Sequence, residues 1–204
     1  MPARALIFGV VLNVLAFALL ASTANLLSAM LTLSAPLFYV FVYTLWLKPR
    51  TVQNIVIGGA AGAVPALVGW AAVRGSLAAP AWILFGVVFF WTPAHFWALA
   101  LKYRDDYAAA GIPMLPVVRG IEETTRQIAA YAMVTVAFTF AMTLTGEVGR
   151  FYALAVFVLG FLFVIRALAL SRMPTPQAAI RFFAWSNVYL MLVFVAVAAD
   201  ALIR

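Results

Sequence analysis

Long apolar segments without charged residues alternate with short polar stretches along this chain. Residues 5–47 carry no charge, and this length suffices for two crossings of a bilayer, because about 20 apolar residues span its hydrocarbon core. Uncharged segments follow at 51–73, 75–101, 127–146 and 182–199, and the segment 151–170 carries one charge, Arg166, near its end. The pattern predicts seven transmembrane helices.

Turn residues and charges set the expected helix boundaries. The first two helices are expected at 5–21 and up to residue 47, joined by a hairpin at 22–25, the third at 52–73 and the fourth at 80–101. A long polar loop is expected at 102–126, which holds eight of the 19 charged residues, 13 basic plus 6 acidic. Three more helices follow with short connections, and residues 1–204 are expected to form a single domain.

The composition agrees with a membrane protein and excludes other classes. Apolar residues make up 67% and charged residues 9% of the chain, and its mean hydropathy is +1.10. A soluble domain is about 45–50% apolar and about 25% charged, and a disordered chain needs low hydrophobicity and high charge. Membrane barrels show alternating segments of about 10 residues, a pattern absent from this sequence. The expected fold is therefore an all-α polytopic membrane helix bundle.

The distribution of charge predicts the orientation. The formal net charge is +7, but the basic residues are spread over the loops between membrane helices, which argues against nucleic acid as a partner. Ten of the 13 Lys and Arg residues belong to the side that holds the N-terminus. Because positive residues collect on the cytoplasmic side, we expect the N-terminus and the charged loops in the cytoplasm and the C-terminus on the outer face of the cell (inner) membrane.

One acidic pair stands out in the long polar loop. Asp105 and Asp106 are adjacent, and hard carboxylate oxygens bind Mg²⁺, which commonly also bridges substrate phosphates. Cationic residues on the same side are expected to contact a diphosphate leaving group, whose negative charge grows as its carbon–oxygen bond breaks. These candidates are Lys48, Arg50, Lys102, Arg104 and Arg119. The alternative is a charged interfacial loop that only fixes the topology.

The one histidine, His95, is expected deep in the fourth helix. Residues 95, 99, 102 and 106 have the spacing i, i+4, i+7 and i+11, so one helical face would carry His95, Lys102 and Asp106 if the helix continues. An ionisable side chain at membrane depth is a functional candidate. The sequence leaves three functional roles open for His95: haem-iron ligand, proton carrier or polar substrate contact. The structural alternative is a histidine that is only hydrogen-bonded to a neighbouring helix.

Further candidates lie near the same end. Asn54 at the start of the third helix fits a phosphate or metal contact, or a helix cap, and Tyr103 is another candidate substrate contact. Gly58 and Gly62 have the small-xxx-small spacing of close helix packing, which also leaves room for a bulky apolar ligand. Aromatic residues around His95 would line a prenyl or porphyrin cavity, stabilise a carbocation, or only pack. They are Phe89, Phe90, Trp91, Phe96 and Trp97.

Taken together, four segments resemble the protohaem IX farnesyltransferase (haem O synthase) family of UbiA-type intramembrane prenyltransferases. They are residues 43–48 (YTLWLK), 51–65 (TVQNIVIGGAAGAVP), 91–101 (WTPAHFWALAL) and 105–120 (DDYAAAGIPMLPVVRG). These motifs are long and specific, and the resemblance covers essentially the whole chain.

The resemblance implies transfer of a farnesyl group from farnesyl diphosphate to a vinyl group of haem B, with addition of water, to give haem O for terminal oxidases. It also implies Mg²⁺ held by two aspartate-rich motifs, the second of which matches Asp105 and Asp106. His95 is then a candidate haem or proton-transfer residue, and the basic residues named above are candidate contacts for the diphosphate or the haem propionates.

The sequence departs from the family pattern in three places. Ala66 and Ala94 stand where a second proline usually follows Pro65 and Pro93, which a helix tolerates. Family members have nine membrane helices, and their first aspartate-rich motif follows the second helix. This chain has seven expected helices, and every Asp and Glu lies at position 105 or later. We therefore expect the chain alone to be nearly inactive, with a mis-assigned start, an incomplete gene or a partner chain accounting for the missing helices and motif.

Two other functions remain open from the sequence. A related prenyltransferase acting on a quinone or chlorophyll precursor would share the fold, although the sequence of residues 105–120 argues against it. A non-catalytic membrane protein that binds haem or helps to assemble an oxidase would explain the missing aspartate motif.

Overall fold

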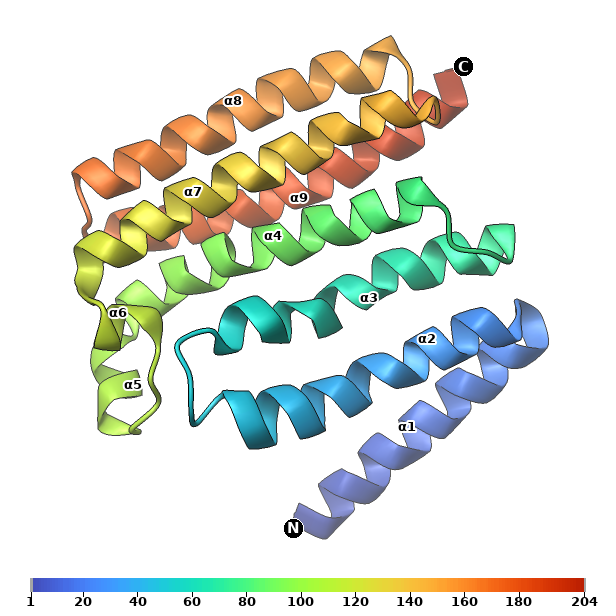
Figure 1. The fold of residues 1–204 in the computed structure, drawn as a ribbon, viewed down its shortest axis with the longest axis horizontal. Helices are drawn as coiled ribbons and strands as arrows, with labels where there is room; N and C mark the ends of the chain where they lie inside the picture. Colours follow the sequence, from blue (N-terminus) through green and yellow to red (C-terminus); the bar gives the residue numbers. More distant parts are fainter. Residues whose placement is uncertain (1, 204) are drawn as a thin grey trace.

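The computed structural model describes residues 2–203, and all regular structure in this range is helical (Figure 1). The chain begins with α1 (Pro2–Thr23), α2 (Leu26–Leu37), the π-helical η1 (Phe38–Leu47), α3 (Asn54–Arg74) and α4 (Ala79–Lys102). It continues with the short α5 (Arg104–Ala109) and α6 (Leu115–Val118), then α7 (Gly120–Ala141), the 3₁₀ turn η2 (Met142–Thr145), α8 (Arg150–Arg172) and α9 (Pro176–Ile203).

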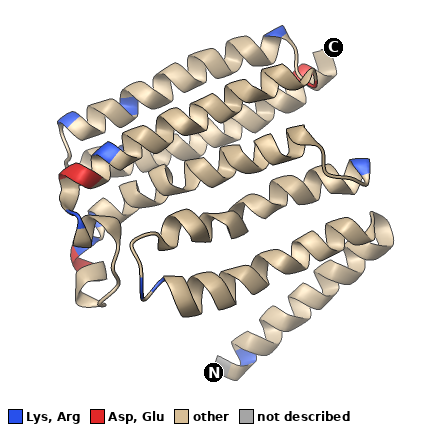
Figure 2. Cartoon of the chain, viewed as in Figure 1, with Lys and Arg blue, Asp and Glu red and all other residues tan. Residues whose placement is uncertain are grey.

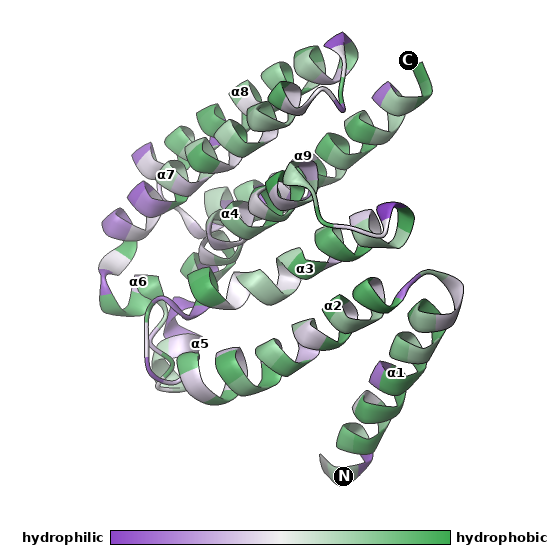
Figure 3. Ribbon diagram, turned by 45° about the vertical axis from the view of Figure 1, so that its right-hand side comes forward, coloured by the Kyte–Doolittle hydropathy of each residue, from purple (hydrophilic) through white to green (hydrophobic). Residues whose placement is uncertain are grey.

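Seven helical stretches of these residues are long and apolar enough to cross a membrane. α2 and η1 together form one of them, and α7 and η2 another, so the prediction of seven spans is confirmed. Figure 3 shows apolar residues along most of their length and polar residues gathered at their ends. The protein is an integral membrane protein.

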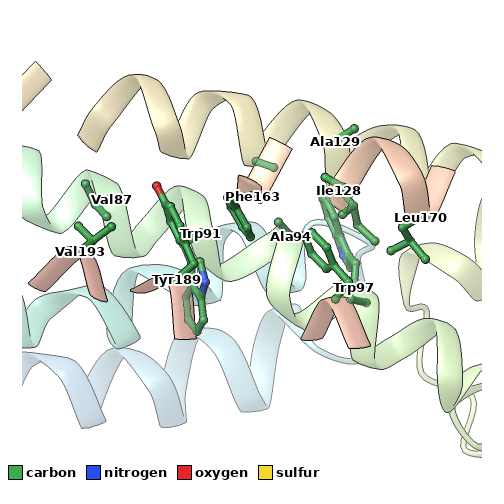
Figure 4. Packing of buried hydrophobic residues seen from close by; sticks show 14 of the residues in the cluster. Val87, Trp91, Ala94, Trp97, Ile128, Ala129, Phe163, Leu170, Tyr189 and Val193 are labelled. Atoms are coloured by element: carbon green, nitrogen blue, oxygen red, sulfur yellow. The ribbon is translucent and has the colours of Figure 1, made fainter. Parts of the chain in front are cut away.

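α4 lies in the middle of the bundle and packs against α3, α7 and α9 (Figure 1). Its buried side chains meet those of α7, α8 and α9 in one apolar core, shown in Figure 4. Within this core the rings of Phe163 (α8) and Tyr189 (α9) are stacked nearly in parallel, with centroids 4.2 Å apart. Aromatic stacking adds to the free energy that burial of the rings already contributes, so this pair helps to hold α8 against α9.

α1 and α2 are far more exposed than the other helices. In the 18-residue apolar stretch of α1 no residue is buried, whereas 56% of the corresponding stretch of α4 is buried. α1 packs against α2, and α2 packs against α3. An exposed apolar face of this kind is suited to contact with lipid chains, which are as apolar as the side chains themselves.

The second span changes its helix type after Pro36. Proline has no N–H to donate within a helix, and from Phe38 onward the helix has π geometry. At its end the N–H of Lys48 donates to the carbonyl oxygen of Tyr43, five residues earlier, over 2.8 Å. The expected end of this helix at residue 47 is confirmed, whereas its π geometry was not anticipated by the apolar pattern.

The predicted polar loop over residues 102–126 is mostly helical, which corrects the sequence prediction. α5 and α6 form within it, and α7 already begins at Gly120. Glu122 and Glu123 lie in the first turn of α7, where the helix dipole favours negative charge. Arg126 forms a 2.6 Å ion pair with Glu123 one turn earlier. The charged first turns of a membrane helix therefore have the composition that the sequence analysis assigns to a loop.

Charged residues gather at the two ends of the helices, as Figure 2 shows. The end formed by the C-terminus of α4 and the N-terminus of α7 carries most of them, together with α5 and α6. The opposite end carries Arg74, Glu147, Arg150 and Asp200. This separation agrees with the predicted asymmetry of the loops.

Candidate functional site

An apolar cavity of about 440 Å³ lies between the end of α2, η1, α3 and α4. Its walls are made of small and aromatic residues, and none of the lining residues is charged. They are Ala35, Pro36, Tyr39, Tyr43, Ile55, Gly58, Gly59, Ala61, Gly62, Val88, Trp91, Thr92 and Phe96. A cavity of this volume and chemistry fits an isoprenoid chain or the edge of a flat apolar ring system.

The two glycines predicted to pack closely behave differently. A methyl group built on Gly58 would overlap the ring of Tyr43, so this glycine allows η1 to approach α3. Nothing lies within 4 Å of the corresponding position on Gly62. The expectation of close packing is therefore confirmed for Gly58, while Gly62 leaves space in the cavity wall.

The aromatic residues of α4 are divided between two cavities and the core. Trp91 and Phe96 line the apolar cavity, as one of the sequence hypotheses required. Trp97 lines a second cavity, described below. Phe89 and Phe90 pack edge to face against each other, with centroids 5.1 Å apart.

His95 stands behind the cavity wall and does not line the apolar cavity. Its ring is buried and stacked between Trp91 and Phe183, with centroid distances of 4.2 Å and 4.3 Å. Its Nδ1 lies 2.6 Å from Ser186 Oγ on α9, and the indole N–H of Trp91 donates to the Ser186 carbonyl oxygen over 2.9 Å. This geometry matches the alternative of a histidine bonded to a neighbouring helix, and Ser186 was not anticipated from the sequence.

His95 and Asp106 do not share a continuous helical face, contrary to the sequence prediction. α4 ends at Lys102, and Tyr103 has the non-helical angles φ −100° and ψ 27°. α5 then starts in a new direction with Asp105 and Asp106 in its first turn. Both carboxylates are exposed, whereas His95 is buried. The condition that the helix continues past residue 102 is therefore not met.

α5 nevertheless lies beside the apolar cavity. Its Tyr107 is half-buried and interacts electrostatically with Tyr43, which lines the cavity. Burial raises the pKa of the Tyr107 hydroxyl above its ordinary value, so this side chain stays neutral at physiological pH. The acidic pair is thus carried by the same short helix as Tyr107.

The predicted cationic residues gather at the same end of the bundle without forming one cluster. Lys48 is half-buried, while Arg50, Lys102, Tyr103 and Arg104 are exposed. The ammonium of Lys102 lies 5.1 Å from the centroid of the Tyr103 ring. None of the four cations forms a salt bridge with another residue of the range 2–203.

Asn54 is fully buried at the start of α3. Its Nδ2 lies 3.4 Å from the carbonyl oxygen of Lys48, and its Oδ1 has no hydrogen-bond partner among the described residues. A buried acceptor without a donor is unusual in a native protein. Asn54 therefore remains a candidate ligand contact beside Lys48, and no helix-capping hydrogen bond from its side chain is found in the described range.

Arg119 belongs to a second cavity of about 550 Å³, which is mostly polar. This polar cavity lies between the start of α3, the end of α4, α6 and the first turns of α7. Its lining residues are Val52, Gln53, Trp97, Leu115, Arg119, Glu123, Arg126, Gln127 and Tyr131. It shares no lining residue with the apolar cavity, and of its members the sequence predicted Arg119 as a substrate contact and Trp97 as a cavity-lining aromatic residue.

Asp105 and Asp106 are two adjacent carboxylate donors at this end that could hold a divalent metal. Residues 2–203 contain no group of three or more His, Cys, Asp or Glu side chains with the spacing of a metal site. Mg²⁺ is commonly bound by one or two carboxylates, with waters and substrate phosphates completing its octahedron. Two exposed carboxylates therefore fit a Mg²⁺ ion that arrives with a diphosphate.

Comparison with known proteins gives a consistent family assignment. The model of the UbiA prenyltransferase family matches residues 1–194. A protein from Gloeobacter violaceus named protoheme IX farnesyltransferase is 51% identical over 203 residues, covering 99% of this chain and 67% of that protein. Proteins of the same name from Thermus thermophilus and Picosynechococcus sp. are 53% and 49% identical over 96% and 98% of this chain.

The chain spans only part of these relatives: 67% of the Gloeobacter protein, 64% of the Picosynechococcus protein and 32% of the Thermus protein. A solved structure of digeranylgeranylglyceryl phosphate synthase in membranes matches with a TM-score of 0.80. That match covers 100% of this chain and 71% of the other at 16% identity, and it shows the fold alone.

Proposed function

This chain belongs to the UbiA prenyltransferase family, and from this premise we propose that it carries out protoheme IX farnesyl transfer. A farnesyl group passes from farnesyl diphosphate to a vinyl group of haem B, and haem O results. The observation that carries the proposal is the apolar cavity of about 440 Å³ with the acidic helix α5 beside it. The names of the relatives favour haem over a quinone precursor and favour catalysis over a non-catalytic role in haem binding or oxidase assembly.

The proposed reaction balances with water as the third reactant. The C1–oxygen bond of farnesyl diphosphate breaks, and C1 forms a bond with the terminal carbon of the vinyl group. Water adds its oxygen to the other vinyl carbon, and a proton and diphosphate leave. Mg²⁺, when bound with the diphosphate, neutralises charge that develops on the leaving group.

The chain's own residues have two tasks in this proposal. Asp105 and Asp106 hold the metal, and the cations at the same end of the bundle bind the diphosphate or the haem propionates. These cations are Lys48, Arg50, Lys102, Arg104 and Arg119, with Asn54 and Tyr103 as neutral contacts. The apolar cavity holds the farnesyl chain away from water, and Trp91 and Phe96 provide ring faces that attract a developing carbocation.

We assign His95 a positioning role in this scheme. Its contact with Ser186 and its stacking on Trp91 fix one wall of the apolar cavity. A His95→Gln variant is expected to change the KM for farnesyl diphosphate more than kcat. A proton-transfer role would instead lower kcat and change its pH profile.

The proposed membrane is the cell (inner) membrane, with the N-terminus and the charged end in the cytoplasm. Ten of the 13 basic residues on that side support this orientation. Farnesyl diphosphate and haem would then both reach the site from the cytoplasmic side of the bilayer.

We further infer that the chain on its own turns over slowly. Two carboxylates supply few ligands for the metal ions that a diphosphate recruits, and the chain spans about two thirds of the Gloeobacter relative. The remaining ligands would come from the part of the relatives that this chain does not cover, or from a partner chain. Fusing that part of the Gloeobacter protein to this chain should raise the rate strongly.

The experiment is an assay of haem O formation in membranes that contain either the chain or this fusion. Haem B, farnesyl diphosphate and Mg²⁺ are supplied, and the product is identified by its mass. We expect haem O from the fusion and little from the chain alone. A fusion that folds but yields no haem O, or that farnesylates a quinone precursor instead, would overturn the proposal.

A further inference from the structure

A small hollow of about 160 Å³ lies between the end of α8 and the start of α9. Its lining contains one arginine from each helix, Arg166 of α8 and Arg181 of α9, and the other lining side chains are apolar. No residue of α8 or α9 lines the apolar cavity or the polar cavity. This space, called the arginine hollow below, is therefore separate from the site proposed for farnesyl transfer.

The two arginines lie at a similar depth in the membrane. α8 ends at Arg172, six residues after Arg166, and α9 begins at Pro176, five residues before Arg181. At about 1.5 Å per residue, both backbone positions lie roughly 7–9 Å from the ends of their helices. α8 has 23 residues, a length of about 34 Å, which is slightly more than the hydrocarbon thickness of about 30 Å. Both arginines therefore start within the edge of the hydrocarbon layer, and their long side chains reach its surface.

The positive charge of the hollow is not neutralised by the described part of the chain. Arg166 and Arg181 are exposed, and neither forms a salt bridge with a residue of the range 2–203. The chain has no Asp or Glu from residue 148 to residue 199, and Figure 2 shows only basic residues at this end of α8. On the neighbouring α7, Glu123 is paired with Arg126. Because ionisable side chains at membrane depth are normally paired, we expect a negative partner from outside the chain.

Arg166 is held in position by an aromatic ring of α9. Its Cζ lies 4.4 Å from the centroid of the Trp185 ring. Such a cation–π contact orients the guanidinium without using its N–H groups in hydrogen bonds to oxygen atoms. The N–H groups of a guanidinium form a planar fork that matches the oxygens of a phosphate. With Arg181 on the facing helix, the hollow offers two such forks to one anion.

We propose that the arginine hollow binds the headgroup of an anionic phospholipid, with Arg166 and Arg181 donating to its phosphate oxygens. Basic pockets between transmembrane helices at a membrane surface suit such headgroups. The hollow is smaller than the roughly 300–1,000 Å³ of a site for a drug-sized ligand, so it takes the phosphate while the acyl chains lie outside it. Residues one and two turns deeper on the same helix faces are apolar, and they offer the chains an apolar surface. They are Leu162 and Val158 of α8, and Trp185 and Val188 of α9.

The test compares lipids that share their acyl chains and differ in headgroup charge. The purified full chain in nonionic detergent is mixed with dioleoyl phosphatidylglycerol or dioleoyl phosphatidylcholine, and native mass spectrometry measures the retained lipid. A third arm supplies inorganic phosphate, which separates a lipid headgroup from free phosphate. EDTA excludes binding through Mg²⁺, and about 0.15 M salt screens attraction between distant charges. Phosphatidylglycerol should bind at least about tenfold more tightly than phosphatidylcholine.

Substitutions in the hollow have matched controls on α8. Arg166→Gln and Arg181→Gln should each weaken phosphatidylglycerol binding by about tenfold and leave phosphatidylcholine binding unchanged. Arg172→Gln removes an exposed charge at the same end of α8 that does not line the hollow, and its effect should stay below about twofold. Arg150→Gln, at the other end of α8, should have no effect. All four side chains are exposed, so the variants should fold as the unchanged chain does.

Each outcome decides the question. A preference for phosphatidylglycerol that is lost in both variants of the hollow supports the proposal. Equal binding of the two lipids, or equal losses in Arg166→Gln and Arg172→Gln, would overturn it, as would binding of inorganic phosphate without a preference for phosphatidylglycerol. Because Arg166 and Arg181 lie on different helices, either variant remains informative if the other does not fold. The samples contain neither haem nor farnesyl diphosphate, so the result is independent of the proposed reaction.

Discussion

Carboxylates have different surroundings at the two ends of this bundle. Asp200, near the end of α9, is 1% exposed and accepts hydrogen bonds from the N–H groups of Gly149 (2.6 Å) and Tyr152 (3.0 Å) at the start of α8. Asp105 and Asp106, at the other end, are exposed and form no salt bridge within residues 2–203. A buried carboxylate bonded to backbone N–H groups serves the structure, whereas an exposed pair is available to a ligand.

The basic residues follow the same division. Arg74 lies at the same end of the bundle as Asp200, and it forms a 3.5 Å salt bridge with Glu147. Lys48, Arg50 and Arg104 lie at the other end and have no salt bridge in the described part of the chain. Among the described residues, the first end thus pairs Arg74 with Glu147, whereas the other end pairs Arg126 with Glu123 and leaves Lys48, Arg50 and Arg104 without a salt bridge. Substitutions at the two ends should accordingly separate stability from ligand binding.

The largest effect on chemistry is expected from Asp106→Asn. The change removes an oxygen proposed to bind the metal without removing a packing contact, so we expect Mn²⁺ affinity, measured by electron paramagnetic resonance, to fall at least about tenfold. Haem O formation in the fusion protein should fall about a hundredfold or more. The unfolding temperature should stay within about 1 °C, since exposed substitutions change stability little.

Glu122→Gln is the matched control for this prediction. Glu122 is an exposed acid at the same end, in the first turn of α7, and its loss should leave Mn²⁺ binding unchanged. If both substitutions lower the Mn²⁺ affinity equally, Asp106 contributes only general negative charge near the membrane and is not a specific metal ligand.

At the opposite end, Asp200→Ala should lower stability without affecting ligands. It leaves two backbone N–H groups at the start of α8 without their acceptor, which costs about 2 kcal/mol. The corresponding fall in unfolding temperature is about 5 °C for a chain of this size. Circular dichroism in detergent measures it, and binding of a farnesyl thiolodiphosphate analogue reports on the site. Asp200→Asn, which keeps one acceptor oxygen, should give a smaller fall.

Two glycines of α3 differ in whether they line the apolar cavity. Gly62 and Gly69 both have open space where a Cβ would stand, but only Gly62 lines the apolar cavity. Gly62→Leu should therefore weaken binding of farnesyl thiolodiphosphate by about tenfold, because the added side chain occupies the space proposed for the isoprenoid. Gly69→Leu should bind normally, and both variants should unfold near the temperature of the unchanged chain. Equal binding by both would show that the isoprenoid lies elsewhere.

Most of the fold was predictable because it depends on the length of apolar runs. Five uncharged stretches, one of them long enough for two crossings, and a sixth stretch with a single charge predicted the seven spans, and the glycines and aromatic residues of α3 and α4 pointed to an apolar cavity between them. The break after Lys102 was missed, since Tyr103 is neither Gly nor Pro and gives no sign of a helix end. The early start of α7 was missed because its first turn carries Glu122 and Glu123, which also suit a loop.

The parts of the site that the sequence did not predict are those formed by segments that lie far apart in the sequence. Ser186 meets His95 across 91 positions of sequence, and no local spacing relates the two. The polar cavity combines residues from 52–53, 97, 115–119 and 123–131. Sequence spacing indicates which residues share a helix face, but the contacts between helices depend on how α4 packs against α3 and α7.

The smallest effect is expected from Arg74→Gln. Both partners of the Arg74–Glu147 pair are partly exposed, with side chains 58% and 39% accessible, and such pairs contribute at most about 0.5 kcal/mol. The unfolding temperature should therefore change by no more than about 2 °C, and ligand binding should not change. Because screening by salt weakens exposed pairs, the difference from the unchanged chain should shrink further in about 0.5 M NaCl. A fall as large as that of Asp200→Ala would mean that the exposed charges at this end also hold the bundle together, and the contrast between structural and ligand-binding charge would then rest on burial alone.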